Sequence, residues 1–162
     1  MSGPPSAPAP ELDGIRFRQA EAADVPSLAL LPGRGEPGDA ADPRMLPYLL
    51  GEHHPQQALP PRAMWLALDG DSPVGYIAGH LTRRFGCDGE LQYLYVLPAY
   101  RGGEVAAGLL RRLAGWLVEQ GARRVCVDVG SERGGRFYAR HGAKHLRKHW
   151  MVWEDVGEVL GQ

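Results

Sequence analysis

Cysteine is scarce in this chain of 162 residues, with only Cys87 and Cys126 present. Two cysteines cannot form the disulfide framework of a small secreted scaffold, so we expect a reducing, cytoplasmic environment. Cys126 lies in an apolar run and is interpreted as a reduced core thiol. Long apolar runs are lacking too: none approaches the ~20 residues of a membrane span, and we expect no membrane partner.

Net charge is also small, at −1 from 18 basic and 19 acidic residues. Such a balance disfavours an obligate nucleic-acid coat. A late basic stretch, residues 136–148, is typical of a solvated face. Nucleic-acid binding would need exposed aromatics among these charges, whereas Trp150 and Trp153 resemble core residues. We therefore predict no nucleic-acid partner.

The domain organisation follows from length and composition. Residues 1–12 are rich in proline and alanine, lack the pattern of a secretory signal, and are expected to form a flexible leader. Residues 13–157 have the length of one domain with a substantial core. Residues 158–162 are expected to form a tail.

Hydrophobic periodicity predicts a mixed sheet with crossover helices. One stretch of the chain, residues 32–61, is rich in glycine and proline. They are expected to form a loop with one or two short helices, too irregular to carry the sheet. The predicted strands are 15–18, 63–68, 74–81, 90–96 and 124–129, with one or two more in 144–154. The predicted helices are 25–31, with Asp24 as N-cap, then 105–120 and 134–141.

Residues 96–110 carry the most informative pattern: the end of a strand, a glycine-bearing turn and the start of a long helix. Such a junction directs unpaired backbone N–H groups and the positive end of the helix dipole toward one point, which suits a phosphate. A glycine-rich turn alone is weak evidence for such a site, since it is more often a tight connection. The patterns of P-loop and Rossmann nucleotide sites are lacking.

This segment, Tyr-Leu-Tyr-Val-Leu-Pro-Ala-Tyr-Arg-Gly-Gly, resembles the acyl-CoA motif of the GNAT acyltransferases. The family pattern is Arg or Gln, two residues, Gly, one residue, then Gly or Ala. Arg101 and Ala106 match it, whereas Glu104 replaces the central glycine. Downstream, Phe-Tyr-Ala-Arg-His-Gly-Ala (residues 137–143) resembles the family's Phe-Tyr-x-x-x-Gly-Phe segment, with Ala143 replacing the phenylalanine.

The resemblance implies an α/β (α+β) fold. Its mixed, mostly antiparallel sheet would have six to seven strands, about four flanking helices, and a splay between strands 4 and 5. Acetyl-CoA, the co-substrate, would lie in the splay. The amide of Leu94 would face the thioester carbonyl, and Val96 would bind the pantetheine arm. The predicted contacts to the rest of CoA come from Arg101, Gly102, Gly103, Glu104, Val105, Ala106, Ala107, Ser131 and Arg136.

The chemistry requires a neutral amine, so a base must remove a proton. Glu90 is the first candidate, because it lies six residues before Val96, where some family members carry a catalytic glutamate. The even spacing predicts one shared face of the strand. The alternative for Glu90 is a strand-end carboxylate in solvent. Tyr138 matches the family's general acid, which protonates the departing thiolate. Its alternative is a tyrosine packed on the sheet.

The histidines are weaker candidates. His53 and His54 lie where the family builds its acceptor site, although exposed loop histidines are commoner. His141, His145 and His149 have the four-residue spacing of a helical metal site. Gly142 interrupts that helix, and we predict no metal.

Two functions remain open on sequence grounds. The first is an N-acetyltransferase acting on a small-molecule or peptide amine, with a homodimer compatible with the family. The second is a CoA-binding or regulatory module without turnover, suggested by the departures at Glu104, Ser131 and Ala143. The retained Glu90 and Tyr138 favour the enzyme.

Overall fold

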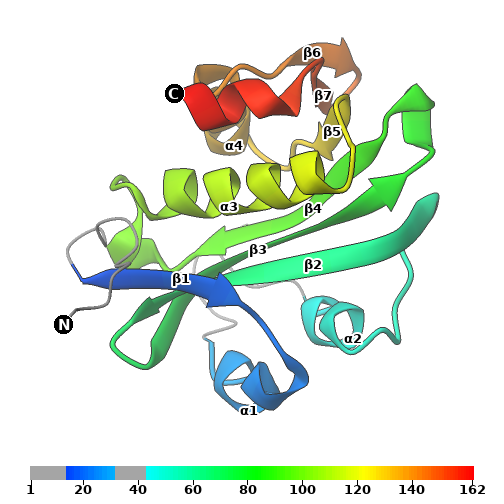
Figure 1. Cartoon of the computed structure of the whole chain (residues 1–162). Helices are drawn as coiled ribbons and strands as arrows, with labels where there is room; N and C mark the ends of the chain where they lie inside the picture. The colour runs from blue at the N-terminus through cyan, green and yellow to red at the C-terminus, as the bar shows by residue number, and fades with distance from the viewer. Residues whose placement is uncertain (1–13, 32–42) are drawn as a thin grey trace, which may run out of the picture.

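The computed structural model describes residues 14–31 and 43–162. A seven-stranded sheet with the order β1-β2-β3-β4-β5-β7-β6 forms its centre (Figure 1). Neighbouring strands are antiparallel, except that β4 and β5 are parallel. The expected mixed, mostly antiparallel sheet is therefore confirmed. The strands are β1 (Ile15–Gln19), β2 (Ala58–Asp69), β3 (Ser72–Thr82), β4 (Gly89–Val96), β5 (Val125–Asp128), β6 (Lys144–Arg147) and β7 (Trp150–Trp153).

Strand β2 begins earlier than the sequence predicts and includes Pro60 and Pro61. β1 pairs with β2 only from Trp65 onward, and the register to β3 is irregular between Leu59 and Arg62. Proline is tolerated at such an edge, where its missing N–H breaks no regular ladder. The prediction that this stretch cannot carry the sheet is wrong for residues 58–61. Residues 32–42 of the same prediction lie outside the described residues.

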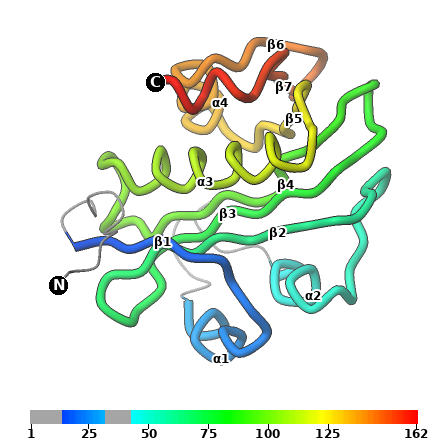
Figure 2. Tube along the Cα trace, viewed as in Figure 1, coloured from blue at the N-terminus to red at the C-terminus, as the bar shows by residue number. Residues whose placement is uncertain are grey.

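Helix α3 (Val105–Glu119) covers one face of the sheet, and α4 (Glu132–Arg140) lies on the same side. Figure 2 follows the chain from β4 through α3 to β5, the crossover that two parallel neighbours require. The leucine stripe of α3 is fully buried, as its periodicity predicts. The stripe consists of Leu109, Leu110, Leu113 and Leu117.

The opposite face carries a second core beneath α1 (Val25–Leu28) and α2 (Met45–Leu49). Helix α1 is shorter than the predicted 25–31. Leu30 is 82 % exposed, and only Leu31 of the predicted last turn packs against this core, so little burial stabilises a longer helix. The two faces of the sheet thus bury different side chains, and the strands between the two cores position the residues of the candidate site.

Asp24 stands at the N-cap position of α1, but its side chain does not cap that helix. Its carboxylate instead accepts hydrogen bonds from Arg18 Nη2 at 2.7 Å and from the Glu21 amide at 2.7 Å. These bonds tie β1 to the start of α1. The hydrogen bond from Arg18 holds the pKa of Asp24 below its usual value.

Asp24→Asn is expected to lower the free energy of unfolding by about 1 kcal/mol at pH 7, after allowance for screening of the half-exposed Arg18. A lowered folded-state pKa stabilises the protein above the unfolded value, near ~3.9, and this contribution disappears as pH falls through the folded-state value. Urea unfolding of wild type and variant should therefore differ at pH 7 and converge once the pH falls below the folded-state pKa of Asp24. Asp71→Asn is the matched control, because Asp71 is fully exposed; an equal loss there would contradict the account.

The C-terminal residues extend the packed domain beyond the predicted boundary at residue 157. A 3₁₀ helix, η4 (Val156–Gly161), lies along α3, and Val156 and Val159 are buried. The residues expected to form a tail therefore contribute to the core because valine recurs on the inner side of this turn. Across the described ranges, no helix is long and apolar enough to cross a membrane.

Candidate active site at the fork between β4 and β5

The strands β4 and β5 separate soon after they meet. They pair over only three positions, the last being Leu91 with Val127. β5 ends at Asp128, whereas β4 continues to Val96. We call this opening, bounded by residues 92–96 and Asp128, the fork. The predicted splay between strands 4 and 5 is confirmed.

The backbone of β4 beyond Leu91 presents polar groups to the fork. The Leu97 amide donates to the Val74 carbonyl of β3 at 2.8 Å. Backbone groups of successive residues point to opposite edges of a strand. Because those of Leu97 point to β3, those of Val96 and Leu94 are directed toward the fork. The Val96 carbonyl already accepts a bond from Arg101 Nε at 2.7 Å. A ligand in the fork would therefore meet the amides of these two residues.

The turn before α3 presents a second set of amides. Gly102 has a φ of +85°, a conformation that favours glycine. A Cβ added to Gly102 or Gly103 would meet no atom within 4 Å, so this side of the turn is open. The first turn of α3 leaves its N–H groups without intrahelical acceptors. This open, amide-lined turn fits a pyrophosphate group.

Glu104 is exposed and occupies the N-cap position of α3 without a side-chain cap bond. Its carboxylate therefore lies in solvent rather than in the core. Val105 is buried, whereas Ala106 and Ala107 are partly buried on the first turn. Glu104 has a φ of −103°, a backbone conformation that does not require glycine.

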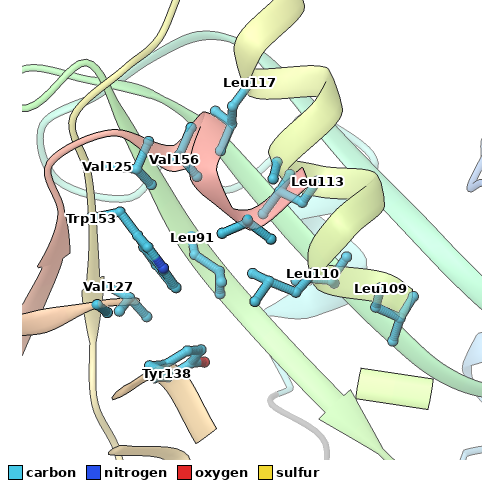
Figure 3. Packing of buried hydrophobic residues seen from close by; sticks show 14 of the residues in the cluster. Leu91, Leu109, Leu110, Leu113, Leu117, Val125, Val127, Tyr138, Trp153 and Val156 are labelled. Atoms are coloured by element: carbon cyan, nitrogen blue, oxygen red, sulfur yellow. The ribbon is translucent and has the colours of Figure 1, made fainter. Parts of the chain in front are cut away.

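Tyr138 projects from α4 into the core beside Val127 and Trp153 (Figure 3). Its ring meets that of Trp153 edge-on, with 5.7 Å between the centroids. Burial raises the pKa of Tyr138, and the charge of Asp128 raises it further. The phenol therefore stays protonated at neutral pH and can act as a proton donor.

Glu90 does not share a face with Val96, and that prediction is wrong. The register between β3 and β4 shifts at Gly79 and leaves Gln92 as the extra residue of a β-bulge. One extra residue reverses the alternation of side chains beyond it. Val96 consequently packs toward α3, whereas Glu90 faces the side of α2.

The Glu90 carboxylate is buried within a polar network rather than exposed in solvent. Its Oε1 accepts from Thr82 Oγ1 at 3.1 Å and from Arg84 Nε at 3.2 Å. His80 Nε2 lies 3.6 Å from the same oxygen, and His80 Nδ1 lies 2.9 Å from the Tyr48 hydroxyl. The sequence reasoning missed His80 and Tyr48. The available signal was a lone histidine within the apolar run 74–81.

Two predicted CoA contacts have other partners in the structure. The Ser131 hydroxyl accepts from the Gly134 amide at 3.0 Å and caps α4. Arg136 is on the outer side of α4, 67 % exposed, and lies 3.9 Å from Glu132. The structure therefore gives Ser131 a capping role, while Arg136 remains available to a ligand.

The loop histidines have separate partners. His54 Nδ1 lies 2.7 Å from Arg62 Nη2. His141 contacts Gln162, whereas His149 contacts Asp128. No cluster of three metal-ligating side chains occurs among residues 14–31 and 43–162.

Beside α2, a hollow of about 290 Å³ is bordered by Glu21, Tyr48 and Arg62.

Comparison with known proteins agrees with this geometry. The model of the acetyltransferase (GNAT) family matches residues 35–143. Uncharacterized N-acetyltransferases of Mycobacterium tuberculosis and Mycobacterium bovis are 38 % identical over 85 residues, which are 51 % of this chain and 53 % of each relative. The chain thus spans about half the length of the curated relatives it matches.

Solved structures share the fold at lower identity. The PaiA N-acetyltransferase of Thermoplasma acidophilum, in complex with coenzyme A, is 16 % identical with a TM-score of 0.60, covering 85 % of this chain and 96 % of its own. A GNAT acetyltransferase of Staphylococcus aureus is 16 % identical with a TM-score of 0.66, covering 86 % and 98 %.

Proposed function

Because this chain belongs to the GNAT family of acetyltransferases, we propose that it transfers an acetyl group from acetyl-CoA to a primary amine by direct attack in a ternary complex. The observation that carries the proposal is the continuity of the fork with the open turn before α3. The fork can hold the extended thioester arm of acetyl-CoA, and the amides of the turn can bind its pyrophosphate. The acceptor is a small-molecule or peptide amine.

The residues that would hold acetyl-CoA follow this path. The amides of Leu94 and Val96 would bind the pantetheine end, and the turn and first helical residues 102–107 would bind the pyrophosphate. Arg101 would stabilise the turn through its bond to the Val96 carbonyl. Arg136 is retained as a candidate for the 3′-phosphate because it is exposed on the adjacent helix.

Three groups would carry the acyl transfer. The Leu94 amide would stabilise the negative charge that develops on the thioester oxygen. Glu90 would take a proton from the attacking nitrogen, through a water because its carboxylate is buried. Tyr138 would donate a proton to the departing sulfur, since its buried phenol carries a proton at neutral pH. The carbon–nitrogen bond forms as the carbon–sulfur bond breaks, with the electron pair of the latter leaving on sulfur.

The proposal is tested by thiol release from acetyl-CoA in the presence of tyramine, spermidine, kanamycin and a tetrapeptide with a free amino terminus. Amine-dependent release by the purified chain is the expected result. Tight CoA binding without release for any of these amines would favour the alternative of a CoA-binding module without turnover.

Glu104→Gly is expected to change the Kd of CoA by less than about tenfold, because the exposed carboxylate leaves the amide in place. Calorimetric titration with CoA gives this value directly. Glu119→Gly, at the other end of α3, controls for the loss of one charge and the gain of a glycine. A tightening of more than about tenfold for Glu104→Gly alone would contradict the solvent-facing orientation.

A further inference from the structure

An aspartate–histidine pair lies at the open end of β5. Asp128 Oδ1 lies 2.6 Å from His149 Nδ1, and the two side chains are 54 % and 59 % exposed. The His149 carbonyl also accepts from the Val129 amide at 2.7 Å. Both the backbone and the ring of His149 are therefore held against the end of β5.

This pair lies at the fork. Asp128 follows directly after Val127, the last residue of β5 that pairs with β4. Val127 packs toward α3, so Asp128 faces the opposite side of the sheet. Glu90 faces that side too, since its register partner is Cys126. The pair therefore lies on the same face of the sheet as Glu90, at the end of β5 where the fork opens.

The reaction must remove two protons from the acceptor nitrogen. An aliphatic amine with a pKa near ~10.4 is an ammonium in all but fewer than about one molecule in a thousand at pH 7. The first proton must leave before attack, because an ammonium has no lone pair. The second leaves as the new bond forms, and this is the proton proposed above for Glu90. The buried Glu90 has no direct access to solvent for a further proton.

We propose that His149, oriented by Asp128, deprotonates the entering ammonium of the acceptor. This assignment rests on the proposed acetyltransferase function and adds a catalytic residue to it. The Asp128 carboxylate accepts from the Nδ1–H, which leaves the lone pair on Nε2 for the incoming proton. The same arrangement orients the base in other aspartate–histidine pairs.

The proton balance is complete without a further reactant. One proton passes from the ammonium to His149 Nε2 and then to solvent. The second passes to Glu90, Tyr138 protonates the leaving sulfur, and the proton on Glu90 restores the phenol through water. One acetamide, one thiol and one released proton result from an ammonium and a thioester.

Several charged groups surround the pair and would influence its titration. Arg147, the last residue of β6, and Lys148 directly precede His149. From the β3–β4 connection, Arg84 lies over the Trp150 ring, 4.7 Å from its centroid, and His149 lies against that ring. Glu90, held by Arg84, and Tyr138 of α4 complete this set.

The test is the pH profile of kcat for His149→Gln with the most active of the four probe amines. At pH 7 kcat should fall at least about tenfold, because the variant depends on the small neutral fraction of the amine. As pH rises toward 10 the neutral fraction grows, and kcat should return to within about threefold of wild type. Asp128→Asn should show the same pH-dependent loss.

His145→Gln is the matched control, since His145 is an exposed histidine of the same β6–β7 hairpin, and it should behave as wild type. A loss in His149→Gln that is equal at all pH values would assign the pair a structural role and overturn the inference. A wild-type profile would also overturn it. Absence of turnover by the wild-type chain with every probe amine would overturn the proposed function first, and the inference with it.

Discussion

Tyr138→Phe is expected to lower kcat for acetyl transfer about a hundredfold while the Kd of CoA stays within about twofold of wild type. The phenol is buried, and burial together with the charge of Asp128 raises its pKa. It therefore remains a proton donor across the working range, and its removal leaves the sulfur to depart as a thiolate. The aromatic ring and its contact with Trp153 are retained in the variant.

Steady-state thiol release and calorimetric titration measure these two quantities. Tyr100→Phe makes the same chemical change at a hydroxyl that donates to Asp69 at 2.6 Å, outside the fork, and should retain wild-type kcat. Equal kcat values for Tyr138→Phe and wild type would show that Tyr138 is not the proton donor. Tyr138 would then be a tyrosine packed on the sheet.

Gly79→Ala is expected to lower the free energy of unfolding by about 2 kcal/mol. A Cβ at this position would lie 2.7 Å from the Glu90 carbonyl oxygen and 3.0 Å from Leu113 Cδ2. The first contact is with backbone at the bulge and cannot be relieved by turning a side chain. The glycine is therefore required by the close approach of β3 and β4 beneath α3.

Urea denaturation of Gly79→Ala gives the change directly. Gly115→Ala is the control within α3, where the nearest atom outside that helix, Leu160 Cδ2, lies 4.0 Å from the added Cβ. That variant should be neutral or slightly stabilised, since alanine favours the helix. A loss below about 0.5 kcal/mol for Gly79→Ala would show that the bulge can relax around a methyl group.

The sequence predicts those parts of the fold in which one periodicity covers a whole element. The leucine stripe of α3 and the alternating valines of β5 required no tertiary information. The extent of β2 was missed because Pro60 and Pro61 normally interrupt a strand. Strand β1 is short and pairs with β2 only from Trp65 onward. Pro60 and Pro61 therefore lie outside the regular ladder, where proline is tolerated.

The site was less predictable because it depends on register and on distant contacts. The bulge at Gln92 turns Glu90 to the other face, and no local pattern marks it. Ser131 stands three residues before Gly134, the spacing of an N-cap, and this local bond explains it without a ligand. Asp128 and His149 are 21 residues apart, and only the pairing of β5 with β7 brings them together.

The most direct test of the account is calorimetric titration of the purified chain with acetyl-CoA, alongside CoA and ATP as the nucleotide control. We predict binding of acetyl-CoA and CoA with a Kd in the micromolar range, and much weaker binding of ATP, because the fork and the amide-lined turn recognise the pantetheine arm and the pyrophosphate together. Absence of CoA binding at millimolar concentration would contradict the proposed site and leave only the shared fold.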